Sequence, residues 1–188
     1  MKKGSIVLVV VLVLILLSGI YAVSKNNSFV ALKENVNKAS SDIDTALERR
    51  ADLIPNLVST VKGYVKHEES VIDSVTEARQ NLLSAKSLDE KAAASSKLDS
   101  AISALMVIVE NYPDLKASEN FIQLQDELAG TENRIATARK DYNDAVKDYN
   151  SYIKRIPNSI IAGMFNFEKK DYFKADEGAN EVPKVNFE

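Results

Sequence analysis

The 188-residue chain has no cysteine, no tryptophan and a single histidine. The lack of cysteine excludes disulfide scaffolds, thiolate metal sites and cysteine nucleophiles. One histidine removes most routes to a zinc site or a histidine-based catalytic triad. The net charge of −3 comes without a basic block, which argues against a dedicated nucleic-acid binder. We therefore predict neither a cofactor nor a nucleic-acid partner.

Glycine and proline are also scarce, with six and four residues respectively. Both counts lie below the average usage of about 7% and about 5%, which is typical of long helices joined by few loops. The sequence has no glycine-rich phosphate loop and no nucleophile elbow, and His67 lacks the second histidine of the zincin motif. Nothing specific supports catalysis, so we predict that the protein is not an enzyme.

One long apolar run stands near the N-terminus. Ile6–Val23 consists almost wholly of valine, leucine and isoleucine, and no charge falls between Gly4 and Ser24. A helix of this length extends about 27–31 Å, enough to cross the hydrocarbon core of a bilayer. We expect an uncleaved anchor. A signal peptide cleaved after Ala22 would place Ile20 at position −3, where a small residue is needed.

The charges beside this run suggest its orientation. Lys2 and Lys3 precede it and favour a cytoplasmic N-terminus. The sequence therefore predicts a single-pass membrane protein whose bulk lies outside the cytoplasm. Lys25, Lys33 and Lys38 follow the run and leave the cytoplasmic alternative open.

The rest of the chain shows helical periodicity. Apolar residues spaced three and four apart mark helices within 32–47, 58–82 and 98–109, and the clearest stripe consists of Phe121, Leu124, Leu128, Thr131, Ile135, Ala138, Tyr142, Ala145, Tyr149, Tyr152 and Ile156. The predicted fold is all-α: an N-terminal transmembrane helix followed by an antiparallel up-down four-helix bundle with long helices. We expect an anchor at 1–26, the bundle at 27–157, an apolar segment at 158–173 and a loose charged tail at 174–188.

Pro55 is ambiguous. The apolar spacing continues through it, which favours one long kinked helix, whereas matching the helix lengths favours a hairpin. We predict the hairpin, with Asp52 capping the second helix and Pro55 in its first turn.

Other local signals are simpler. Ser87 and Glu90 fit a capping box, and Asp114 is suited to cap the fourth helix. Tyr142 and Tyr149 lie seven residues apart on one face, which favours core or seam positions over a ligand platform. The apolar segment after Pro157 is predicted either to lie in the membrane interface or to close the end of the bundle.

Two groups of polar residues are candidate sites. With a hairpin at Pro55, the turns near 51–56 and 111–115 meet at the end away from the membrane, giving a candidate partner-binding tip: Arg49, Arg50, Asp52, Asn56, Tyr112 and Asp114. Ordinary cap chemistry is the alternative. The second group is a candidate buried polar site, in which Glu68 lies on an apolar stripe and pairs with Arg134 or Arg139. A partly exposed seam residue is the alternative for Glu68.

Several sequence blocks closely resemble the LemA family of bacterial membrane proteins. The resemblance covers about 27–173, and its most specific block runs from Arg49 to Val58 (Arg49-Arg50-Ala51-Asp52-Leu53-Ile54-Pro55-Asn56-Leu57-Val58), with Glu110-Asn111-Tyr112-Pro113-Asp114 and Thr131-Glu132-Asn133-Arg134-Ile135-Ala136 further on. It implies a single-pass anchored helical bundle and brings no established enzymatic activity or agreed catalytic residues. Ile20 departs from the lipid-tethered members, because it stands where their modified cysteine would be.

The favoured hypothesis is a non-enzymatic structural or protein-interaction module at the bacterial cell envelope. Its partners would be the lipid bilayer, through Ile6 to Val23, and an unidentified protein or a second copy of the chain. The alternative is a ligand-binding protein or enzyme that uses a bundle pocket at Glu68 with nearby arginine and tyrosine residues. A membrane-remodelling role for the segment Ile160–Phe167 ranks third.

Overall fold

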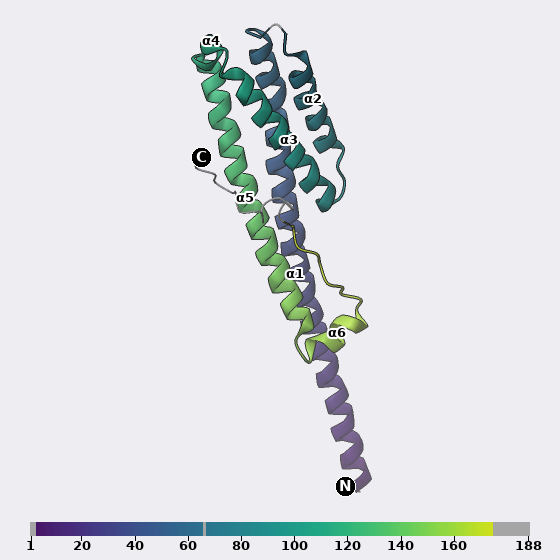
Figure 1. Ribbon diagram of the computed structural model, residues 1–188. Helices are drawn as coiled ribbons and strands as arrows, with labels where there is room; N and C mark the ends of the chain where they lie inside the picture. The colour runs from purple at the N-terminus through teal and green to yellow at the C-terminus, as the bar shows by residue number, and fades with distance from the viewer. Residues whose placement is uncertain (1–2, 66, 175–188) are drawn as a thin grey trace, which may run out of the picture. The chain divides into compact units, whose positions relative to one another are not determined.

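The computed structural model describes residues 3–65 and 67–174, which fold as helices joined by short loops (Figure 1). The helices are α1 (Lys3–Lys62), α2 (Glu69–Ser84), α3 (Leu88–Val109), α4 (Pro113–Lys116), α5 (Glu119–Lys154) and α6 (Asn158–Met164). These described residues contain no strand, which confirms the all-α class. Apart from Lys174, the predicted loose tail lies outside the described residues.

The chain divides into two compact units. Unit 1 comprises Met1–Ser40 and Asp141–Tyr172, and unit 2 comprises Ser41–Lys140 and Phe173–Glu188. Helices α1 and α5 each contribute one stretch to both units.

The predicted hairpin at Pro55 is wrong. Helix α1 continues through Pro55 and ends at Lys62, so the first loop of unit 2 follows Lys62 and precedes α2. The apolar stripe continues across the proline, because Leu47, Ile54, Leu57 and Val61 are all buried. Asp52 is an exposed residue inside the helix and caps nothing.

A contact from α2 explains how the helix tolerates Pro55. Proline has no N–H, so the carbonyl four residues earlier, that of Ala51, loses its helical donor. Arg79 of α2 supplies the missing donor: its Nε lies 2.8 Å from the Ala51 oxygen. Because Ala51 is fully buried, water cannot easily serve this carbonyl.

Side-chain contacts set the helix directions in unit 2. Lys91 and Asp99 of α3 pair with Asp44 and Arg50 of α1 respectively, so these two helices run parallel. The α5 residues Arg139 and Glu132 meet Ser95 of α3 and Arg50 of α1, so α5 runs antiparallel to both. The predicted apolar stripe of α3 is buried throughout, with Leu98, Ile102, Leu105 and Val109 in the core.

The ends of the other helices follow local chemistry. Ser87 and Glu90 form the predicted capping box at the start of α3. The segment predicted as one fourth helix is instead split into α4, with Pro113 in its first turn, and α5, which begins at Glu119. Asp114 therefore lies in α4 and does not cap the long helix. Most of the predicted stripe of α5 is buried or half-buried, but Ile156 follows the helix end and is exposed.

In unit 1 the chain reverses after α6 (Figure 1). The Phe167 N–H donates to the Ala162 carbonyl and the Asn166 N–H to the Gly163 carbonyl, while Asn166 has a positive φ of 56°. This is a Schellman motif, in which asparagine takes the left-handed position that usually favours glycine. Phe167 then packs against Phe29 of α1, with 5.0 Å between the ring centroids.

Candidate functional site

The N-terminal part of α1 presents apolar side chains on all sides. Every large apolar residue from Ile6 to Val23 is exposed within unit 1. Ser18 donates its hydroxyl to the Leu14 carbonyl at 2.8 Å, so this polar group is satisfied within the helix. Among the described residues α3 is also long and apolar enough to span a bilayer. However, 39% of its most apolar stretch of 18 residues is buried in the protein, as in a core helix.

A lysine and several aromatic rings surround α1 just after this segment. The Lys25 ammonium donates to the Tyr152 hydroxyl at 3.2 Å and lies 5.3 Å from the Tyr21 ring centroid. The hydrogen bond to Tyr152 raises the pKa of Lys25, while side-chain hydrogen bonding with Ser28 and Lys25 lowers the pKa of Tyr152. Phe29 lies one turn further on and is fully buried, with its ring edge-to-face against Tyr152. Aromatic rings and lysines gather in this way at membrane–water interfaces.

Three side chains of α5 hold the segment that follows α6. The hydroxyls of Tyr149 and Tyr142 donate to the carbonyls of Glu168 and Asp171, at 2.8 and 3.0 Å. Asn150 both donates to the Lys170 carbonyl and accepts from the Lys170 N–H. Burial raises the pKa of both tyrosines. Both are buried, as predicted for core positions.

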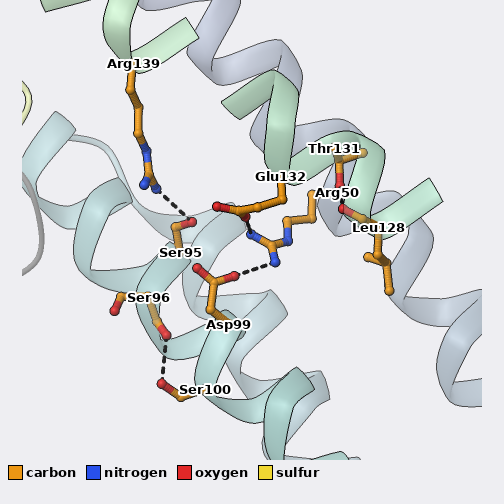
Figure 2. A network of polar contacts seen from close by, with 9 residues as sticks. All are labelled: Arg50, Ser95, Ser96, Asp99, Ser100, Leu128, Thr131, Glu132 and Arg139. Carbon is orange, nitrogen blue, oxygen red and sulfur yellow. Dashed lines mark hydrogen bonds and ion pairs between the residues drawn. The ribbon is translucent and has the colours of Figure 1, made fainter. Parts of the chain in front are cut away.

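An ion-pair cluster joins three helices inside unit 2 (Figure 2). The two terminal nitrogens of Arg50 on α1 contact Asp99 of α3 and Glu132 of α5, each at 2.5 Å. Its side chain is only 7% exposed, whereas those of Asp99 and Glu132 are 36% and 46% exposed. One planar guanidinium thus bridges carboxylates on two other helices.

Arg139 extends this polar region along the same faces of α3 and α5. It donates to the Ser95 hydroxyl at 3.2 Å, one turn before Asp99 on α3 (Figure 2). Its guanidinium also lies 4.8 Å from the Phe173 ring centroid. Thr131, the polar residue in the apolar stripe of α5, donates to the Leu128 carbonyl. The terminal nitrogens of both arginines thus contact protein oxygens, whereas the Nε atoms of Arg50 and Arg139 are buried without a hydrogen-bond partner among the described residues.

The structure does not bring Glu68 together with Arg134 or Arg139 as predicted. Glu68 is half-buried and precedes α2, where its backbone carbonyl accepts from Val71 and Ile72. It borders a surface hollow of about 420 Å³, also lined by Lys62, Glu69 and Asp73. Arg134 is exposed on α5, and Arg139 bonds Ser95 instead. Among the described residues no group of acidic or histidine side chains could hold a metal ion.

The residues of the predicted tip are also dispersed. Asp52 and Asn56 are exposed within α1, and Arg49 forms a surface pair with Glu127 at 3.3 Å. Arg50 points inward, whereas Asp114 is exposed and Tyr112 half-buried at α4. Because α1 and α3 run parallel, the end of unit 2 is formed by the loop between α1 and α2, by α4 and by the start of α5, and we call this the loop end (Figure 1).

Sequence reasoning missed four residues of this unit: Arg79, Ser95, Asp99 and Glu132. A signal for the cluster was present, because Arg50 interrupts the apolar stripe between Leu47 and Ile54. A charge at such a position requires a partner, but the sequence does not say which carboxylates supply it.

The chain is similar in sequence to known proteins. The profile of the LemA family matches residues 39–187. The chain is 26% identical to magnetosome protein MamQ 2 of Paramagnetospirillum magneticum, over 84% of this chain and 67% of that protein. It is 28% identical to protein LemA of Metamycoplasma hominis, over 82% of this chain and 71% of that protein. With most of its length matched by this profile, the chain belongs to the LemA family.

Proposed function

We propose that the chain is a non-enzymatic, membrane-anchored interaction module at the bacterial cell envelope. One observation carries the proposal: a single uninterrupted helix, α1, contains both the exposed apolar segment of membrane length and the first helix of unit 2. Family membership and the apolar helix support membrane association. We further propose a single pass, an extracytoplasmic unit 2 and up-down packing of its four long helical stretches.

The interior of unit 2 favours a structural role over chemistry. Its core consists of apolar side chains, and its buried arginine is neutralised by carboxylates on two other helices. The alternative pocket at Glu68 receives less support, because the hollow there lacks both predicted arginine partners. Such an interior is suited to holding helices in register and presenting a surface.

We assign partner binding to the loop end of unit 2. Tyr64 in the first loop and Ile122 in the first turn of α5 are large, exposed apolar side chains, and the exposed Asp114 of α4 belongs to the same end. Exposed apolar residues with polar neighbours are common at protein-binding surfaces. The partner is either another envelope protein or a second copy of this chain.

Site-specific photo-cross-linking in the native membrane tests this assignment. A photoreactive amino acid replaces Tyr64 or Ile122, and Leu83 serves as the matched control because it is a similarly exposed apolar residue near the opposite end of α2. We expect one adduct of the same mass from the first two positions and none from Leu83. An adduct of twice the chain mass identifies a second copy. No adduct at the loop end, or the same pattern from all three positions, contradicts the proposal.

A further inference from the structure

We propose that α6 and the residues before it form a second membrane contact, an interfacial one, beside the transmembrane segment. The inference rests on the proposed anchoring of α1 and goes beyond it, because it assigns lipid contact to a separate part of the chain. The ligand is the headgroup and upper acyl region of a bilayer that contains anionic lipid.

Exposure is the first observation. Ile156, Ile160 and Met164 are 85%, 65% and 70% exposed, and Phe165 is exposed as well. The other side of α6 is buried, because Asn158, Ile161 and Ala162 pack within unit 1. One face of the helix therefore packs within the unit, and the other leaves large apolar side chains uncovered. A short helix with this division is suited to lying in an interface.

Position along α1 is the second observation. Tyr152 contacts Lys25 and Phe29, and Phe167 contacts Phe29. The segments before and after α6 therefore both contact α1 within about two turns of Val23. Helix α5 runs toward the apolar segment before the chain turns into α6, and the Schellman motif at Asn166 brings it back (Figure 1). The uncovered side chains of 156–165 therefore lie beside the end of the segment Ile6–Val23.

Charge is the third observation and selects the lipid. Residues 151–167 contain Lys154 and Arg155 and no acidic residue. Both basic residues are exposed, at the end of α5 and next to Ile156. Their long side chains can extend toward phosphates while the neighbouring apolar groups enter the acyl boundary. Continuity with the apolar surface of α1 favours a bilayer over a protein as the occupant.

The absence of tryptophan makes a direct test possible. The full chain, carrying one new tryptophan, is reconstituted in vesicles of phosphatidylcholine and phosphatidylglycerol in equal parts, with bromine placed at shallow or deep acyl positions. The test position is Ile160→Trp. The controls are Leu14→Trp in the middle of the apolar segment and Val107→Trp, an exposed apolar position on α3 in unit 2.

We expect shallow bromines to remove most of the Ile160→Trp emission and deep bromines to remove less of it. Leu14→Trp should show the reverse order, and Val107→Trp should be unaffected by either. A water-like, unquenched Ile160→Trp beside a quenched Leu14→Trp overturns this inference and leaves anchoring intact. Equal quenching of Val107→Trp overturns it too, because contact would not be specific to α6.

Two further outcomes also overturn the inference. A blue-shifted Ile160→Trp spectrum that bromine does not quench, and that reverts as the protein is diluted in lipid, shows that a second copy covers the face. If neither Leu14→Trp nor Ile160→Trp is quenched, anchoring by α1 is refuted and the interfacial contact with it. The failure of the anchor is thus distinguished from the failure of α6 alone.

Discussion

The contact between Arg79 and the Ala51 carbonyl should account for the unbroken course of α1 through Pro55. If so, Arg79 matters only because residue 55 cannot donate an N–H. Arg79→Met removes the donor and retains much of the apolar stem, so it leaves a buried carbonyl unpaired. Pro55→Ala restores the helical N–H, after which the Ala51 carbonyl no longer depends on α2.

The two changes together form a double-mutant cycle with a predictable coupling. A hydrogen bond from a charged donor contributes about 1.5–3 kcal/mol, so Arg79→Met should lower the free energy of unfolding by about that amount when Pro55 is present. In the Pro55→Ala background the cost should fall to below about 1 kcal/mol, because the replacement donor lies in the helix itself. The expected coupling energy is therefore about 1–2 kcal/mol, which is within the range for residues that share a partner.

Urea unfolding of the four full-length variants in detergent micelles, followed by helical circular dichroism, measures this coupling. With a slope of about 2 kcal/mol per molar urea, the Arg79→Met midpoint should fall by about 1 M when Pro55 is present. Arg134→Met is the matched control, because it removes an exposed arginine from α5 and should leave the midpoint nearly unchanged. Equal costs of Arg79→Met in both backgrounds would show that the hydrogen bond does not compensate for the proline.

Three further predictions concern the ion cluster, the segment after α6 and the topology. Arg50→Met should lower the free energy of unfolding by about 1–3 kcal/mol, which is less than for a fully buried pair because both carboxylates are partly exposed. Arg49→Met, at a surface pair, should lower it by less than about 1 kcal/mol. Equal urea midpoints of the two variants would contradict this prediction. The pKa of Tyr149 is raised, so its contribution to stability should be complete below the ordinary value of 10.0 and be lost as the pH rises through the raised value. Alkaline titration of tyrosinate absorbance should show one late-titrating group fewer in Tyr149→Phe, with that of Tyr142 remaining, and an unchanged titration would contradict the assignment. Asp89→Cys and Asn120→Cys, both at exposed positions in a chain without cysteine, should react with an impermeant maleimide on intact cells; labelling only after lysis would place unit 2 in the cytoplasm.

Local and periodic features of the fold were predictable from the sequence. The stripe of α3 and the capping box at Ser87 depend on residues close together in the chain, and both are present in the structure. The core positions of Tyr142 and Tyr149 follow from their heptad spacing. The carbonyls that these tyrosines bind were not predictable, because no side-chain pattern in the sequence marks the backbone of 168–171 as their acceptor.

The wrong prediction at Pro55 has a physical cause. Arginine, aspartate, asparagine and proline all occur between 49 and 56, and the last three of these favour helix ends and turns. Here, however, the donor that replaces the proline N–H comes from a residue 28 positions after Ala51, and one carboxylate partner of Arg50 lies 82 positions later. Local rules cannot include such partners, and therefore they describe this segment as a turn.

The same contacts explain why so polar a segment lies within the helical core. Apolar stripes with heptad spacing allow neighbouring helices to slide by whole turns with little change in burial. Around Arg50 and Ala51, however, α2 contributes Arg79, α3 contributes Asp99 and α5 contributes Glu132. A shift of any one helix by a turn would leave a buried carbonyl or the guanidinium without its partner, at a cost that apolar contacts do not impose. Since α2, α3 and α5 each contact Arg50 or Ala51 of α1, this segment sets one register for the helices of unit 2.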